Sequence, residues 1–326
     1  MQTRFLAVLA SLLLPAFAST ATPSSGPILQ PDKLVILSTS DVKGKTGPCG
    51  CHIPKGGLAR RAGLADSIRA QFGQVAVVDA GGFFPEGDGQ QDLASFLMNA
   101  MGLLNTDAVG VAERDLRYGT SFLCAQTKRS RLPVVCANLI EKRSGKPLFD
   151  PYVIKMIGGV NVGFFGLIGE KVDLGPSRDS LLVEEPAAVA RRTVAEMRRK
   201  GVDVVVLLGQ LGKVENEDLV AAVDGVNSLV VAGSTPVIAK GRVIKNTVAC
   251  YGGENGYYVC KTVLTLNAKR QVTTGEADAI MLGPEVGDQP EMLKFVKGFE
   301  DGRNEKLHKT EAQRAARAAE QDAGGR

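Results

Sequence analysis

KLVILSTSDVKGKTGPCGCHIPKGGLARRAGL, residues 33–64, is the stretch that decides the fold. Residues 33–38 have the apolar pattern of a buried strand, and residues 57–72 have the periodicity of a helix. The glycines and prolines between them predict a loop. Because this loop follows a strand, we expect it at the carboxyl ends of the strands, where α/β folds build their sites. It holds two cysteines and one of the two histidines of the chain.

The rest of the chain continues this alternation of strands and helices. Residues 152–157 and 160–168 flank two glycines, which predicts a hairpin, and residues 237–266 are rich in strand pattern. The other expected strands are 75–78, 108–111, 134–137, 202–208 and 228–232, and the other expected helices are 92–104, 119–131, 187–200, 217–223 and one from about residue 290. Together they predict an α/β fold, a layered α/β/β/α sandwich with mixed sheets.

Length, charge and the first residues limit the class of protein. The 326 residues are enough for a large core, and a net charge of +4 without a basic stripe argues against nucleic-acid binding. Residues 1–18 read as a signal peptide, so we expect a periplasmic or secreted protein with no stable membrane span after cleavage. A disordered lead-in is expected over 19–32, one domain over 33–288, and a C-terminal helix with a charged tail over 289–326.

The six cysteines permit disulfides in an exported chain. Cys250 and Cys260 flank a turn-rich run and could bridge a hairpin, whereas Cys124 and Cys136 have buried surroundings by pattern. Sequence cannot choose among the pairings of six thiols. Inert core thiols are the slightly favoured interpretation for these four residues.

Several phrases of the chain carry a family resemblance. LVILSTSDVKG, GGLARRAGL, VAVVDAGGFFPEG and LPVVCANL resemble the first-strand, helix-start and turn motifs of one family. That family is the 5′-nucleotidases, a branch of the calcineurin-like phosphoesterases, and the likeness to their amino-terminal metallophosphoesterase domain runs from about residue 33 to 266. It implies the same sandwich fold over nearly the whole mature chain.

The ligand positions that the resemblance implies are mostly changed. Family enzymes hold two divalent metals, which activate water and stabilise both oxygens of an in-line displacement. Asp41 keeps the first ligand, but one matched ligand cannot hold a dinuclear site, so conventional dinuclear metals are not expected. The changed positions are Lys43, Gly82, Gln210, Ser234, Pro236 and the run Ala112-Glu113-Arg114-Asp115.

Two further polar segments fall on former active-site loops. Glu113, Arg114, Asp115 and Arg117 could bind an anionic substrate, but we expect them to form a salt-bridge network in place of the lost metals. Residues 79–82, which begin with Asp79, could form an anion-binding backbone nest. A tight strand-to-helix turn is the favoured interpretation of this segment.

The sequence departs from the family pattern in two further ways. The family's carboxyl-terminal, nucleobase-binding domain has no counterpart in this sequence, so nucleotide specificity does not carry over. The Cys-Gly-Cys insertion resembles a group of exported nucleotidase-like proteins, some with selenocysteine at this loop, which implies redox use. In this fold it is expected beside the former metal site.

Three interpretations of the cysteine loop remain open. Cys49 and Cys51 could carry thiol redox chemistry, with His52 as base or orienter and Arg60 and Lys43 as cations that favour a thiolate. The same cysteines and His52 could bind Cu(I) or Zn, or the cysteines could bridge to distant ones and pin a loop.

Thiol redox or thiol transfer at Cys49, Cys51 and His52 is the leading hypothesis, with Asp41, Lys43, Arg60, Asp79 and Arg114 in support. The partner would be a small molecule or a thiol/disulfide protein. The alternatives are a soft-metal or anion binder at the same loop, and a nucleotide-type phosphoester hydrolase with a rebuilt metal site.

Overall fold

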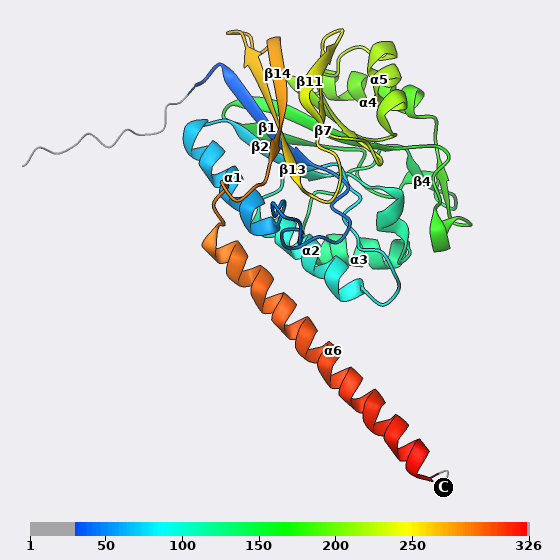
Figure 1. The fold of residues 1–326 in the computed structure, drawn as a ribbon. Coiled ribbons are helices and arrows are strands. Elements are labelled where there is room, and N and C mark those ends of the chain that lie inside the picture. Colours follow the sequence, from blue (N-terminus) through cyan, green and yellow to red (C-terminus); the bar gives the residue numbers. More distant parts are fainter. Residues whose placement is uncertain (1–29, 325–326) are drawn as a thin grey trace, which may run out of the picture.

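The structure is a computed structural model that describes residues 30–324. The expected signal peptide and most of the expected lead-in lie outside the described residues. Figure 1 shows a layered body of strands and helices, from which one long helix, α6, extends.

The strands and helices follow one another in a regular order. The strands are β1 (Lys33–Thr39), β2 (Val75–Asp79), β3 (Ala108–Val109), β4 (Leu139–Glu141), β5 (Lys146–Pro147), β6 (Tyr152–Ile157), β7 (Val160–Ile168), β8 (Leu181–Val183), β9 (Val204–Gln210), β10 (Ser228–Ala232), β11 (Ile238–Ile244), β12 (Thr247–Tyr251), β13 (Tyr258–Leu266) and β14 (Val272–Met281). The helices are α1 (Leu58–Gln71), α2 (Gln91–Leu103), α3 (Thr120–Ser130), α4 (Pro186–Arg199), α5 (Lys213–Ala222) and α6 (Pro290–Gly324).

The long strands form two mixed sheets that are joined at one edge. The first sheet has the order β3-β2-β1-β13-β14 and the second the order β11-β12-β10-β9-β7-β6, with β14 paired to β11. Parallel pairs, such as β1 with β2, occur beside antiparallel pairs, such as β1 with β13. A separate small sheet contains β5, β4 and β8.

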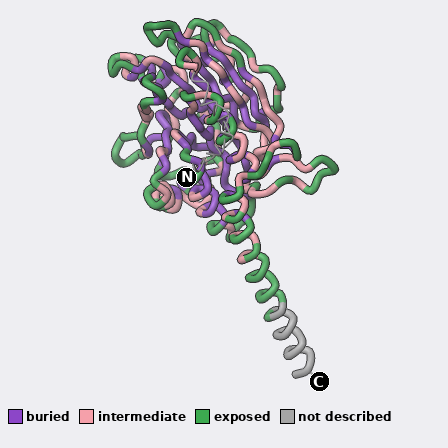
Figure 2. Tube along the Cα trace, turned by 90° about the vertical axis from the view of Figure 1, so that its left-hand side faces the viewer, coloured by how far each residue is buried: buried purple, intermediate pink, exposed green. Residues whose placement is uncertain are grey.

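The two sheets face each other and helices cover their outer faces. Side chains alternate across a strand, so in β1 Leu34 and Ile36 point to the core between the sheets, while Val35 and Leu37 point to α1. α4 and α5 cover the outer face of the second sheet. In Figure 2 the strands are buried along most of their length. The α/β/β/α sandwich predicted from the sequence is therefore confirmed.

Most expected elements are present, with informative exceptions. The hairpin of β6 and β7 has the predicted bounds. Residues 134–137 are not a regular strand: Val134 and Val135 make only isolated bridges, since the N–H of Cys136 bonds to Asp150 and that of Ala137 to Gly166. The segment thus crosses between elements instead of pairing along one. β14 was not predicted, because its sequence, VTTGEADAIM, has a glycine and many polar residues.

Helix α6 begins at the expected residue and is anchored only near its start. Met292 and Val296 are buried in the core, and the rings of Phe295 and Phe299 stack on Phe96 of α2. Farther along, the side chains that are described are mostly exposed and the helix leaves the body (Figures 1 and 2). Among the described residues, no helix combines the length and apolar character needed to cross a membrane.

Candidate functional site

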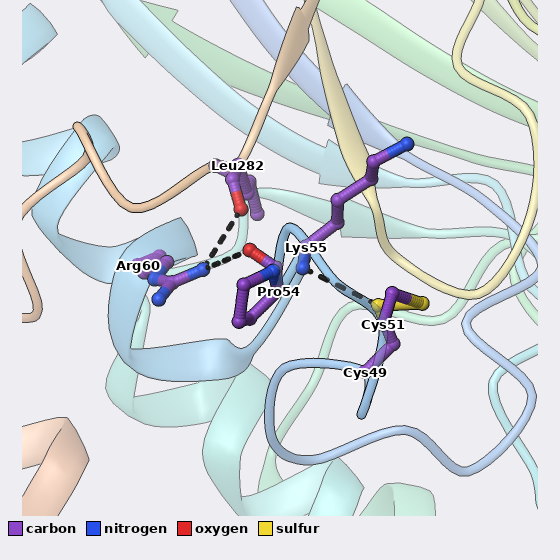
Figure 3. The surroundings of a disulfide bond; sticks show 6 residues. All are labelled: Cys49, Cys51, Pro54, Lys55, Arg60 and Leu282. Carbon is purple, nitrogen blue, oxygen red and sulfur yellow. Dashed lines mark hydrogen bonds between the residues drawn. A yellow bond between two sulfur atoms is a disulfide. The ribbon is translucent and has the colours of Figure 1, made fainter.

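The cysteine loop, residues 47–57, is closed by its own bonds. Cys49 and Cys51 form a disulfide with each other, so bridging to the distant cysteines, one of the three interpretations, is wrong. The N–H of Cys49 donates to the carbonyl of Lys55 at 2.9 Å, and the N–H of Lys55 donates to Sγ of Cys49 at 3.4 Å. Figure 3 shows the disulfide opposite this amide, with the Lys55 side chain pointing away from the sulfurs.

The tip of the cysteine loop lies at the surface. Cys51 and His52 are exposed, Ile53 keeps 51% of its surface exposed, and Cys49 is half-buried. Within residues 30–324, His52 makes no side-chain hydrogen bond, so its expected role as base or orienter has no contact to support it. The same two thiols cannot ligate a metal while they are bonded to each other.

Arg60 fixes the base of the loop. Its guanidinium donates to the carbonyls of Pro54 at 2.7 Å and Leu282 at 3.2 Å, and the N–H of Gly56 also donates to Leu282 at 2.9 Å (Figure 3). Arg60 was expected to act as a cation beside a thiolate. It contacts these backbone carbonyls and the carboxylate of Asp288 instead. Its role is to hold the chain that carries Lys55.

A separate cleft lies at the carboxyl ends of the strands. Its volume is about 790 Å³, and none of residues 47–57 lines it. The cysteine loop folds back against Leu282 and α1 and does not line this cleft, and its expected place beside the former metal site stays a prediction. Its lining includes Asp41, Lys43, Glu113, Arg114, Gln210 and Ser234.

Asp41, which follows β1, accepts hydrogen bonds from residues at the carboxyl ends of β9 and β10. Its Oδ1 accepts from Nε2 of Gln210 at 3.4 Å, and its Oδ2 accepts from the N–H of Gly233 at 3.1 Å. Burial raises the pKa of Asp41, while these donors act in the opposite direction. A Cβ at Gly82 would lie 2.4 Å from Oδ1, so the Asp41 carboxylate lies where a side chain at position 82 would be.

Lys43 has a partner that sequence reasoning missed. Its ammonium lies 2.6 Å from a carboxylate oxygen of Glu254, and both side chains are largely covered. Glu254 follows β12, far from Lys43 in sequence, and no local pattern in the turn-rich run marks it as the partner. This ion pair places a cation and its own counter-charge beside Asp41.

Residues 112–117 do not form the expected salt-bridge network. Asp115 is fully buried and accepts N–H groups from the four residues Gly82, Phe83, Phe84 and Ala112. Burial raises the pKa of Asp115 to about 7, and those N–H groups lower it in part. An anion-binding backbone nest was considered for residues 79–82. The structure has such a nest at residues 82–84, and the anion that it binds is the carboxylate of Asp115.

The arginines of this region point outward from Asp115. Arg114 pairs with Glu86 at 2.8 Å, and Arg117 donates to the carbonyl of Pro85 at 2.6 Å. The expectation of mutual pairing fails because the short helical turn over Glu113–Leu116 turns Asp115 inward and the arginines toward the segment after residue 84.

Asp79 forms a buried ion pair with Arg61, which lies 3.1 Å away, and also accepts from the Thr39 hydroxyl. Burial raises the pKa of Asp79 and lowers that of Arg61, whereas each charge acts against that effect on the other. Sequence reasoning named Asp79 but not this partner. The available signal was an arginine on the apolar face of α1, beside Leu58, Ala62 and Ala65.

The remaining cysteines divide into a bonded pair and two free thiols. Cys250 and Cys260 form a disulfide, so the preference for inert thiols is wrong for them. The bond is not within a hairpin, because β12 pairs in the second sheet and β13 in the first. Cys124 and Cys136 are free, and burial raises the pKa of Cys136 to about 12.

Across residues 30–324, no three or more His, Cys, Asp or Glu side chains gather in a way that could hold a metal ion. Asp41, the ligand position that the family resemblance retains, accepts hydrogen bonds from the protein through both of its carboxylate oxygens.

Comparisons with known proteins agree with the architecture. No protein-family model matches the chain. It is 23% identical over 336 residues to a 5′-nucleotidase of Vibrio cholerae, covering 84% of this chain and 59% of that protein. The chain thus spans less than two thirds of that relative's length.

Solved structures show the same fold. A 5′-nucleotidase precursor from Thermus thermophilus superposes with a TM-score of 0.73 and 24% identity, over 83% of this chain and 59% of the other. The calcineurin-like phosphoesterase YfkN from Bacillus subtilis gives a TM-score of 0.73 at 20% identity, over 85% and 99%. The chain is therefore a relative of the 5′-nucleotidases and has the calcineurin-like phosphoesterase fold.

Proposed function

We propose that this chain is an exported protein, periplasmic or secreted, that works by thiol–disulfide exchange at Cys49 and Cys51. The observation that carries the proposal is the bond between these two cysteines at an exposed loop tip. Exposed disulfides are the labile ones that serve exchange. A structural disulfide would tie separate elements together, as the Cys250–Cys260 bond does.

The charges around the loop indicate the class of partner. Residues 42–65 contain five basic residues and no acidic one. Within the described part of the chain, Lys45 and Lys55 take part in no ion pair, whereas Lys43 and Arg61 are paired. Unpaired cations attract anions and favour the thiolate form of a nearby sulfur. The partner is therefore a small thiol that carries carboxylates, or an acidic face of a thiol/disulfide protein.

The residues of the cleft argue against two-metal hydrolysis. Asp41 is the one side chain retained from the ligand set that the family resemblance implies, and both of its oxygens accept hydrogen bonds from protein groups. The ammonium of Lys43 lies where a further ligand would be needed, and a cation there opposes a bound divalent metal. The residues present do not fit a dinuclear centre.

The experiment is a redox titration of the whole mature protein in glutathione buffers, with free thiols counted by mass after alkylation. Two more thiols are expected to appear at potentials above about −300 mV, the value below which structural disulfides usually lie. Cys49→Ser and Cys51→Ser should each abolish this step. A loop disulfide that resists reduction until the protein unfolds would contradict the proposal.

Elemental analysis of the reduced protein tests the soft-metal alternative in the same samples. Reduction frees Cys49 and Cys51 beside His52, a set suited to Cu(I) or Zn. Stoichiometric copper or zinc that is lost in Cys51→Ser would favour metal binding over exchange.

Hydrolysis is kept as a second candidate because the chain's relative in Vibrio cholerae is a 5′-nucleotidase and a cleft of about 790 Å³ is present. The test is turnover of a generic phosphomonoester with added manganese. Turnover that Asp41→Ala abolishes would establish a rebuilt site, and its absence in the wild type would remove this candidate.

A further inference from the structure

The two sulfurs of the loop disulfide have different surroundings. Cys51 is exposed, whereas Cys49 is half-buried. The N–H of Lys55 donates to Sγ of Cys49 at 3.4 Å. Among the described residues, no hydrogen bond reaches Sγ of Cys51. One sulfur is thus open to a reagent, and the other is held against a hydrogen-bond donor.

We infer that exchange at this disulfide has a fixed order, in which the partner thiolate attacks Cys51 and Cys49 leaves. This inference rests on the proposed exchange function. Attack requires a nucleophile to approach along the S–S axis, and Cys51 is the more exposed residue of the pair. Departure is easier for the sulfur whose thiolate is better stabilised, and a hydrogen bond to an ionised acceptor is stronger than one to a neutral acceptor.

The bonds and electrons balance in two steps. A partner thiolate forms a new S–S bond to Sγ of Cys51, the Cys49–Cys51 bond breaks, and its electron pair leaves on Sγ of Cys49. A second partner thiolate then attacks the partner's sulfur in the mixed disulfide and releases Cys51 as a thiolate. Two partner thiols are oxidised to one disulfide, and the two electrons and two protons that they lose end on Cys49 and Cys51.

The geometry assigns Lys55 and Arg60 as positioning residues for this order. The amide of Lys55 acts through its N–H, not through its side chain, which points away from the sulfurs (Figure 3). Arg60 holds the preceding carbonyl, that of Pro54, at 2.7 Å. This contact fixes the peptide that presents the Lys55 N–H to Cys49.

The test maps the first adduct. The oxidised full mature chain is mixed with glutathione, quenched with acid and alkylated at once. Trypsin should cut after Lys45 and Lys55 and leave both cysteines in one peptide, residues 46–55. Fragmentation of that peptide should find glutathione on Cys51 and the alkyl group on Cys49, in about tenfold excess over the reverse, since a hydrogen bond to a charged group is worth roughly one factor of ten.

Two variants separate the hydrogen bond from simple exposure. Lys55→Pro removes the N–H and should bring the adduct ratio toward one, whereas the matched control Lys55→Ala keeps the N–H and should keep the ratio. Arg60→Ala should lower the ratio, and Arg60→Lys should restore part of it. Circular dichroism and the intact Cys250–Cys260 bond report that each variant is folded.

The outcomes are distinct. Adducts mainly on Cys49, or equally on both sulfurs, would overturn the order while leaving exchange itself in place. A disulfide that glutathione does not open would overturn the proposed function and this inference with it. A ratio that is unchanged in Lys55→Pro would show that exposure alone sets the order and would overturn the roles of Lys55 and Arg60.

Discussion

The carboxylate of Asp41 occupies the space that any side chain at position 82 would require. A Cβ on Gly82 would lie 2.4 Å from Asp41 Oδ1 and 3.0 Å from Asp41 Cα, and the φ of Gly82 is 78°. An acidic residue at position 82, which the family resemblance implies, would therefore conflict with the observed position of Asp41. Introducing one without moving Asp41 is expected to fail.

Gly82→Asp should destabilise the protein without creating a metal site. The new side chain meets both a clash and a positive φ, which together cost about 3 kcal/mol of unfolding free energy. Chemical denaturation measures this cost. In the double variant with Asp41→Ala the clash is removed, so part of the loss should be recovered. Purely additive effects in this double-mutant cycle would contradict the proposed conflict.

Removing the Cys250–Cys260 bond should have a larger effect on stability than removing the Cys49–Cys51 bond. The first links the two sheets and closes a loop with a sequence separation of 10, for which chain entropy predicts about 3 kcal/mol. The second has a sequence separation of 2 and constrains little of the unfolded chain. The paired variants Cys250→Ala/Cys260→Ala and Cys49→Ser/Cys51→Ser should be compared by denaturation under oxidising conditions. Equal losses would count against the distinction between a structural and an exchanging disulfide.

Stability should fall as the pH rises through neutrality, in part because of Asp115. Its pKa is about 7 in the folded protein against a reference of 3.8, so the folded state binds the proton more tightly. The stabilisation is complete below about pH 4 and is lost as the pH passes 7, with a change of about 3 kcal/mol between pH 5 and 8.

Unfolding free energies at several pH values test this. Asp115→Asn, which cannot ionise, should flatten the profile across this range, although it should also lower stability because it offers fewer acceptor lone pairs to the four N–H groups. A variant profile as steep as that of the wild type would assign the pH dependence to other groups, of which Asp41 and Asp79 also have raised pKa values.

The Arg61–Asp79 pair should be sensitive to the loss of one partner. The side chains are 6% and 0% exposed, so Arg61→Met leaves an unpaired carboxylate in the core and should cost about 3–5 kcal/mol. Replacing both residues, with Arg61→Met and Asp79→Asn, should cost less than the sum of the single changes. Arg60→Met is the matched control on the same helix. It removes contacts to backbone carbonyls but leaves no buried carboxylate without a partner. A double-mutant cycle that shows no coupling between Arg61 and Asp79 would refute the pair's role.

The layered fold could be predicted from the sequence because the patterns that indicate its strands and helices are local and repeated. The apolar run of β1 and the glycine pair between β6 and β7 specify strands without knowledge of distant contacts. The contacts of the site were less accessible. Lys43 and Glu254, or Asp115 and Gly82, are brought together only by the tertiary fold, and nothing in either local segment marks its partner.

One contact of the cysteine loop was inaccessible for a related reason. Its place in the chain, between Asp41 and α1, predicted a position beside the former metal site, which stays a prediction. The return segment bonds to Leu282, after β14, a strand that the sequence pattern did not reveal. This contact could therefore not be predicted.

The way the cysteine loop closes has a consequence for engineering. The N–H of Leu58 donates to the carbonyl of Thr46 at 2.9 Å, so the two ends of the insertion meet directly where α1 begins. Residues 47–57 therefore form an insertion that could be deleted as a unit. Joining Thr46 to Leu58 through a short glycine turn would delete the disulfide and leave the cleft intact.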